Sequence, residues 1–187
     1  MLSYFDLRKG VQFVLDGQPY EVLNFEQHFK AQDVVTARTQ IRNLITGKVL
    51  EKSFFKGDTF QEAEMEKMEV KFLYSHRGKA GFCQSNNPAD RFELAQEQVG
   101  EKIKFLKPNQ ALTGIKFQGK IINIVFPVKV QLKVTEAAPG TKGDRAQSGT
   151  KAVTLETGAQ IRAPLFVETD DIVEVNTETG EYVRRVE

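Results

Sequence analysis

The stretch VKVQLKVTEAAP, residues 128–139, decides the fold class, because its apolar and polar side chains alternate from Val128 to Val134. The apolar residues are Val128, Val130, Leu132 and Val134, and the polar residues between them are Lys129, Gln131 and Lys133. Successive side chains of a β-strand point to opposite faces of the sheet. The pattern therefore predicts a strand with one face in a core and the other in water.

Turn signals on the carboxyl side of this strand predict more strands of the same kind. A polar, glycine-rich loop covers residues 140–150, and two hairpins then turn at residues 157–158 and 179–180. Short strands joined by turns of this spacing are typical of a small barrel. Residues 128–187 are therefore predicted to form an OB-fold.

The preceding segment, residues 64–127, gives a similar prediction with a helix added. Hairpin signals flank residues 95–106, where apolar side chains repeat at helical spacing. The repeating residues are Val99, Ile103 and Leu106, at positions i, i+4 and i+7. Strands, one short helix and more strands over such a length predict another OB-fold.

Residues 1–63 alternate as a meander of four strands, with turns at residues 16–17 and 46–48. This spacing indicates a small barrel. The predicted fold class is therefore all-β, with three consecutive β-barrel domains and one short helix in the middle domain. The predicted domains are residues 1–63, 64–127 and 128–187.

The composition excludes several functional classes. Lysines and arginines number 26 against 25 acidic residues, so the whole chain exerts little net attraction on nucleic acid. The single cysteine, Cys83, permits no internal disulfide and no cysteine-based zinc site, and the two histidines lie far apart. No apolar run approaches the roughly 20 residues of a membrane span, and the start MLSYFDLRKG lacks a signal-peptide core. We expect a cytoplasmic protein with no membrane contact, metal or cofactor.

The sequence favours a binding protein over an enzyme. It contains no nucleophile, phosphate-loop or metalloprotease motif, and Asp170-Asp171 is interpreted as a turn rather than an acid or metal pair. Small basic patches on a chain of balanced charge suit a structured RNA partner. A few cations at loop tips would contact the phosphates of that RNA. The alternative is that these cations are solvated charges on strand edges. The candidates form two sets, Arg38, Arg42 and Lys48, and Lys142, Arg145 and Lys151.

Four stretches resemble the bacterial elongation factor P family, and the resemblance runs in order along essentially the whole chain. The stretches are IRNLITGKVLEKSF (41–54), AAPGTKGD (137–144), KAVTLETGAQIRAPLFV (151–167) and VNTETGEYVRRV (175–186). The resemblance implies a small N-terminal SH3/KOW-like barrel followed by two OB-folds. It also implies a monomeric translation factor that binds the ribosome beside the P-site tRNA and relieves stalling at consecutive prolines. Such a factor acts by positioning, while the ribosome supplies the chemistry.

The tip of the first domain departs from the family pattern. The segment HFKAQD (28–33) contains neither Gly nor Pro, although a hairpin turn is expected there. The family tip reads Pro-Gly-Lys-Gly, and those positions correspond here to Lys30, Ala31, Gln32 and Asp33. In the family this tip reaches toward the peptidyl-transferase centre, and its lysine carries an enzymatic extension. Three interpretations of this tip remain open. In the first, Gln32 acts through its unmodified amide, and in the second, Lys30 is the cation that makes the contact. In the third, Gln32 carries a different modification or the tip has lost its function.

The resemblance also implies contact roles for residues of the third domain. Gly143 and Asp144 match a third-domain loop that approaches the messenger RNA codon in the E site, with Arg145 where the family favours Thr. Tyr182 and Arg185 match residues near the tRNA elbow. The alternative function is an OB-fold RNA- or ribosome-binding paralogue that does not stimulate peptide transfer.

Overall fold

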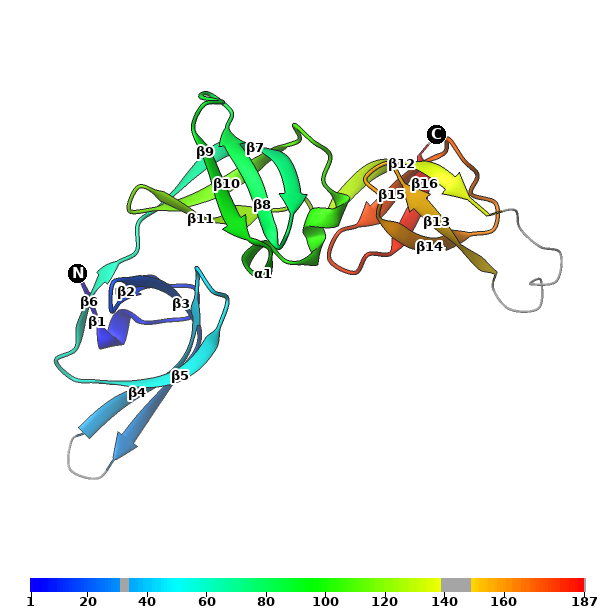
Figure 1. Ribbon diagram of the computed structural model, residues 1–187. Helices are drawn as coiled ribbons and strands as arrows, with labels where there is room; N and C mark the ends of the chain where they lie inside the picture. The colour runs from blue at the N-terminus through cyan, green and yellow to red at the C-terminus, as the bar shows by residue number, and fades with distance from the viewer. Residues whose placement is uncertain (31–33, 139–148, 187) are drawn as a thin grey trace. The chain divides into compact units, whose positions relative to one another are not determined.

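The computed structural model describes residues 1–30, 34–138 and 149–186 and is all-β, with three sheets in chain order (Figure 1). The predicted fold class is therefore confirmed. The first sheet has the order β1-β6-β2-β3-β4-β5. Its strands are β1 (Leu2–Ser3), β2 (Gln12–Leu15), β3 (Gln18–Lys30), β4 (Val34–Asn43), β5 (Val49–Phe55) and β6 (Thr59–Glu62).

The second and third sheets share one connectivity. The second has the order β11-β10-β7-β8-β9 and the third β14-β13-β12-β15-β16, so in each the first strand is central. The second sheet contains β7 (Met65–His76), β8 (Lys79–Gln84), β9 (Arg91–Ala95), β10 (Ala111–Phe117) and β11 (Lys120–Val125). The third contains β12 (Lys129–Ala137), β13 (Thr150–Leu155), β14 (Gln160–Pro164), β15 (Ile172–Asn176) and β16 (Tyr182–Val186).

Two details of the sequence prediction were wrong. The first sheet has six strands rather than four, because the short strand β6 pairs with both β1 and β2. The helix predicted over 95–106 is broken into α1 (Gln96–Val99) and a 3₁₀ turn (Glu101–Phe105). Gly100 separates them with a φ of 74°, a left-handed conformation that an α-helix does not contain.

The chain divides into two compact units, each with its own buried side chains. One unit comprises Met1–Met68 and Gly114–Ile124, and its core includes the edge-packed rings of Phe13, Phe54 and Phe60. The other comprises Glu69–Thr113 and Val125–Glu187. In this second unit, Phe105 lies in the core formed by strands β12–β16. Within the described ranges, no helix has the length and apolar content needed to cross a membrane.

Asn43 fixes the turn between β4 and β5. Its side-chain oxygen accepts hydrogen bonds from the backbone N–H groups of Ile45 and Thr46, both at 2.9 Å, and its amide nitrogen donates to Gln18 at 2.6 Å. Asn43 is buried, with 3% of its surface exposed. Its side chain therefore satisfies two backbone donors at the point where the chain reverses.

Replacing Asn43 with alanine is expected to lower the free energy of unfolding by about 1–3 kcal/mol, because it leaves those two donors unsatisfied. Urea denaturation of the wild type and the variant measures the loss. Gln40→Ala, at an exposed position of the same strand, is the matched control and should change stability by less than about 0.5 kcal/mol. Equal stability of Asn43→Ala and the control would contradict the capping role.

Candidate nucleic-acid interface

The hairpin of β3 and β4 is the longest paired structure of the first sheet. The strands have 13 and 10 residues, and their antiparallel pairing continues to the pair Lys30–Val34 (Figure 1). Residues 28–30 therefore belong to a strand, although the sequence had suggested that the turn begins at His28. The predicted tip residues Ala31, Gln32 and Asp33 lie outside the described residues.

The candidate cations on β4 share one exposed face. Burial alternates along the strand, so that Arg38, Gln40 and Arg42 are exposed while Thr39 and Ile41 are buried. This alternation follows from the two-residue repeat of a strand and leaves both arginine side chains exposed to solvent.

Each of these arginines already has a carboxylate partner. Arg42 donates to Glu21 on β3 at 2.5 Å, and Arg38 donates to Glu51 on β5 at 2.6 Å. Glu51 and, more weakly, Glu26 raise the pKa of the Arg38 guanidinium above its ordinary value. An RNA phosphate would have to compete with these carboxylates, which reduces the attraction that either arginine offers.

The carboxyl-terminal candidates lie on β16. Tyr182 is partly buried and packs against the core of the third sheet, so part of its role is structural. Arg185 lies 3.5 Å from Asp171, and its guanidinium lies over the ring of Phe166, 5.7 Å from the ring centroid. Phe166 is 58% exposed. Arginine and an exposed aromatic ring together form the kind of surface that stacks with nucleobases.

Sequence reasoning missed Phe166. It did not single out this residue, which follows β14 in the chain because that strand ends at Pro164. Proline lacks the backbone N–H that a strand ladder needs, and this signal could have placed the strand end. The loop candidates Gly143, Asp144 and Arg145 lie outside the described residues.

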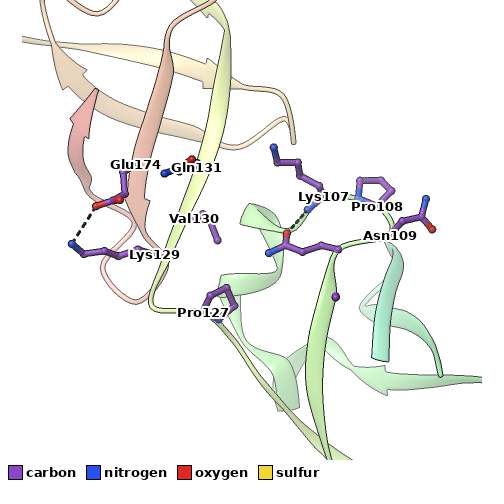
Figure 2. A pocket seen from close by; sticks show the side chains of 10 residues that line it. Lys107, Pro108, Asn109, Pro127, Lys129, Val130, Gln131 and Glu174 are labelled. Atoms are coloured by element: carbon purple, nitrogen blue, oxygen red, sulfur yellow. Dashed lines mark hydrogen bonds and ion pairs between the residues drawn. The ribbon is translucent and has the colours of Figure 1, made fainter. Parts of the chain in front are cut away.

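A hollow of about 640 Å³ lies between residues 107–111 and the start of β12 (Figure 2). Both of its lysines are ion-paired, Lys129 with the buried Glu174 at 3.2 Å and Lys107 with Glu156 at 2.9 Å. Lys129, followed by Arg184, lowers the pKa of the Glu174 carboxyl despite its burial. The charges of this hollow are thus internally balanced, and it has little attraction for an anion.

Comparison with known proteins identifies the family. Residues 3–60 match the family described as the elongation factor P KOW-like domain, and residues 130–185 match elongation factor P, C-terminal. The chain is 38% identical to elongation factor P of Carboxydothermus hydrogenoformans and 40% identical to that of Alkaliphilus oremlandii. Both alignments cover 100% of this chain and 100% of the relative. The chain belongs to the elongation factor P family.

Family membership makes the chain a translation factor rather than an enzyme, as the sequence predicted, and it implies binding to the ribosome. Among solved structures, eukaryotic translation initiation factor 5A from Methanococcus jannaschii is similar with a TM-score of 0.52 and 16% identity. That similarity covers 66% of this chain and 92% of the other. It concerns the fold alone.

Proposed function

We propose that this elongation factor P family member binds beside the P-site peptidyl-tRNA and stimulates peptide-bond formation at consecutive prolines. The observation that carries the proposal is full-length identity of 38–40% to proteins named elongation factor P. Proline is a poor substrate for peptide transfer, since its ring restricts backbone geometry. A factor that holds the tRNA in a reactive position lowers the barrier without supplying a chemical group. The chain acts in the cytoplasm as a monomer with domains at 1–63, 64–127 and 128–187.

The proposed contact with the tRNA acceptor end is the tip of the β3–β4 hairpin. Pairing up to Lys30–Val34 supports this role, because the two long strands stay paired up to the residues that flank the tip in the sequence. Gln32 is the middle residue of the three that join Lys30 to Val34. A glutamine amide offers a donor and an acceptor to tRNA, without the modification that a lysine side chain can receive.

Substitutions at the tip show which of the two candidate residues, Gln32 or Lys30, makes this contact. Gln32→Ala is expected to slow synthesis through three consecutive prolines by about 2- to 10-fold, the effect of losing one or two hydrogen bonds in the transition state. Lys30→Ala should leave the rate unchanged if the amide is the working group. A reconstituted translation assay on a triple-proline message measures both, with Gln40→Ala as the control. The reverse result, slow synthesis only with Lys30→Ala, would move the role to the lysine.

The proposed docking contacts at the carboxyl-terminal end are Arg185 and Tyr182 at the tRNA elbow. The exposed position of Arg185 beside Phe166 supports a contact with RNA. Gly143, Asp144 and Arg145 are proposed to approach the E-site codon, where an arginine suits a phosphate. Arg38 and Arg42 contribute phosphate contacts if RNA displaces their carboxylate partners.

One observation favours a second function, a ribosome-binding paralogue that does not stimulate peptide transfer. Gln32 replaces the residue that carries the chemical extension in the family, so the tip lacks the usual reaching group. Such a paralogue would bind ribosomes as tightly but leave the rate of synthesis through prolines unchanged. The triple-proline assay therefore distinguishes the two functions.

A further inference from the structure

The outer face of strands β7, β8 and β9 carries three cations, Lys71, Lys79 and Arg91. These strands lie side by side in the second sheet (Figure 1). The strand register groups the residues of this face into three rows, Lys71–Cys83–Arg91, Tyr74–Gly81–Glu93 and His76–Lys79–Ala95. We call these rows the middle-sheet face. The opposite face carries core residues, among them Phe72, Phe82 and Leu94.

Among the described residues, two cations of the middle-sheet face have no carboxylate partner in an ion pair. Lys79 is paired with Glu93 at 2.8 Å, and Glu93 is the one carboxylate in the three rows. Lys79, followed by Tyr74, lowers the pKa of Glu93, which therefore stays ionised and balances Lys79. Within the described part of the chain, Lys71 and Arg91 form no ion pair, which leaves two positive charges on this face.

This arrangement differs from the outer face of the first sheet. There, Arg38 and Arg42 each have a carboxylate at 2.6 and 2.5 Å. A phosphate bound at those arginines displaces an existing partner, whereas one bound at Lys71 and Arg91 does not. The middle-sheet face therefore attracts an anion more strongly than the arginines of β4 do.

An aromatic ring lies in the middle of this basic surface. Tyr74 is 46% exposed, and its ring covers Gly81 on the neighbouring strand so closely that a Cβ there would lie 2.6 Å from the ring. Its hydroxyl donates to Glu93 at 2.9 Å, which fixes the ring from its other end. The ring is thus held in place against the sheet and still meets solvent.

We propose that the middle-sheet face binds a single-stranded segment of ribosomal RNA, with Lys71 and Arg91 on its phosphates and Tyr74 stacked on a base. Free cations combined with a fixed, exposed ring are the two components of surfaces that bind single-stranded nucleic acid. An unpaired loop is the form of RNA whose bases are free to stack in this way, whereas a helical stem keeps its bases paired. The proposal rests on the proposed ribosomal function and adds a contact made by the middle of the chain.

The salt dependence of binding to vacant ribosomes, without tRNA, tests the phosphate contacts. The double variant Lys71→Gln/Arg91→Gln should lower the slope of log affinity against log salt by about 1.4, or 0.7 for each contact with single-stranded RNA. At about 0.15 M salt this corresponds to roughly tenfold weaker binding. Lys71→Arg/Arg91→Lys should retain the wild-type slope. Lys52→Gln/Lys56→Gln removes two exposed cations, one on β5 and one in the turn that follows it, and should also retain the wild-type slope.

The stacking contact has its own signature in the same experiment. Tyr74→Leu should weaken binding by about 5- to 150-fold without changing the salt slope, because it removes a stacked base and no charge. Tyr74→Phe keeps the ring and removes only the hydrogen bond to Glu93, so it should bind close to the wild type.

Three results would overturn the inference. An unchanged slope in the Gln double variant would exclude the phosphate contacts, and equal binding by Tyr74→Leu would exclude the stacking. A change of slope that needs P-site tRNA would assign the face to tRNA instead. After any of these results, the proposed function would still hold if the wild-type factor binds ribosomes and accelerates synthesis on the triple-proline message. If the wild-type factor does not bind ribosomes at all, both the proposed function and the further inference are wrong.

Discussion

Replacing Phe105 with alanine is expected to destabilise the core of strands β12–β16 by about 3–5 kcal/mol. Phe105 belongs to the segment between β9 and β10, yet it is 1% exposed and packs with Val130, Leu132 and other residues of the third sheet. Its ring also lies against the turn at Gly180, 3.6 Å from the position of a Cβ there. The truncation would leave a cavity that neighbouring strands fill only in part.

Native-state amide hydrogen exchange is the suitable measurement, because a chain with several cores need not unfold in one step. The amides of β12, β13 and β15 should exchange with an opening free energy lower by the stated amount. Phe55→Ala is the matched control, since Phe55 is 52% exposed and its loss should cost less than about 1 kcal/mol. Protection of the third sheet that is the same in both variants would show that Phe105 is not part of this core.

Reversing the charge of Arg185 is expected to weaken ribosome binding by at least about tenfold. Arg185→Glu removes a cation from the surface beside Phe166 and places a carboxylate where an RNA phosphate is proposed to lie. It also sets two carboxylates near each other, because Arg185 is paired with Asp171 at 3.5 Å. Equilibrium binding to ribosomes that hold a P-site tRNA measures the effect.

Two control variants separate the contact with RNA from effects on folding. Arg185→Gln removes the charge without the repulsion from Asp171 and should show a smaller loss of affinity. Arg162→Glu makes the same change of charge at another exposed position of the third sheet and should bind like the wild type. Wild-type affinity of Arg185→Glu would contradict the docking role of this arginine.

The alternation of side chains was sufficient to predict the fold class, because one buried face per strand is visible in a single sequence. The first strand of the third domain shows this most clearly, since Val130, Leu132 and Val134 are all buried in the structure. The short strand β6 was missed because only Phe60 of its four residues is buried. Helical spacing was misleading around Gly100, where Val99 and Ile103 are buried as expected but the backbone breaks between them.

The candidate site was less predictable, because a charged residue in a sequence does not reveal its partner. Arg38 and Arg42 could be placed on one face from their spacing, but not beside Glu51 and Glu21, which come from other strands. The middle-sheet face likewise depends on the register that brings Lys71 and Arg91 to opposite sides of Cys83. Such cross-strand neighbours arise from tertiary pairing, which local patterns do not encode.

The central claim is that the factor, with an unmodified Gln32 at its tip, relieves stalling at consecutive prolines. The most direct measurement is a reconstituted translation assay on a triple-proline message, with factor produced in a host that lacks any dedicated modifying enzyme. We predict that this factor accelerates synthesis through the prolines and leaves a proline-free message unaffected. Ribosome binding without acceleration, seen also with factor purified from its native host, would contradict the claim and favour the paralogue.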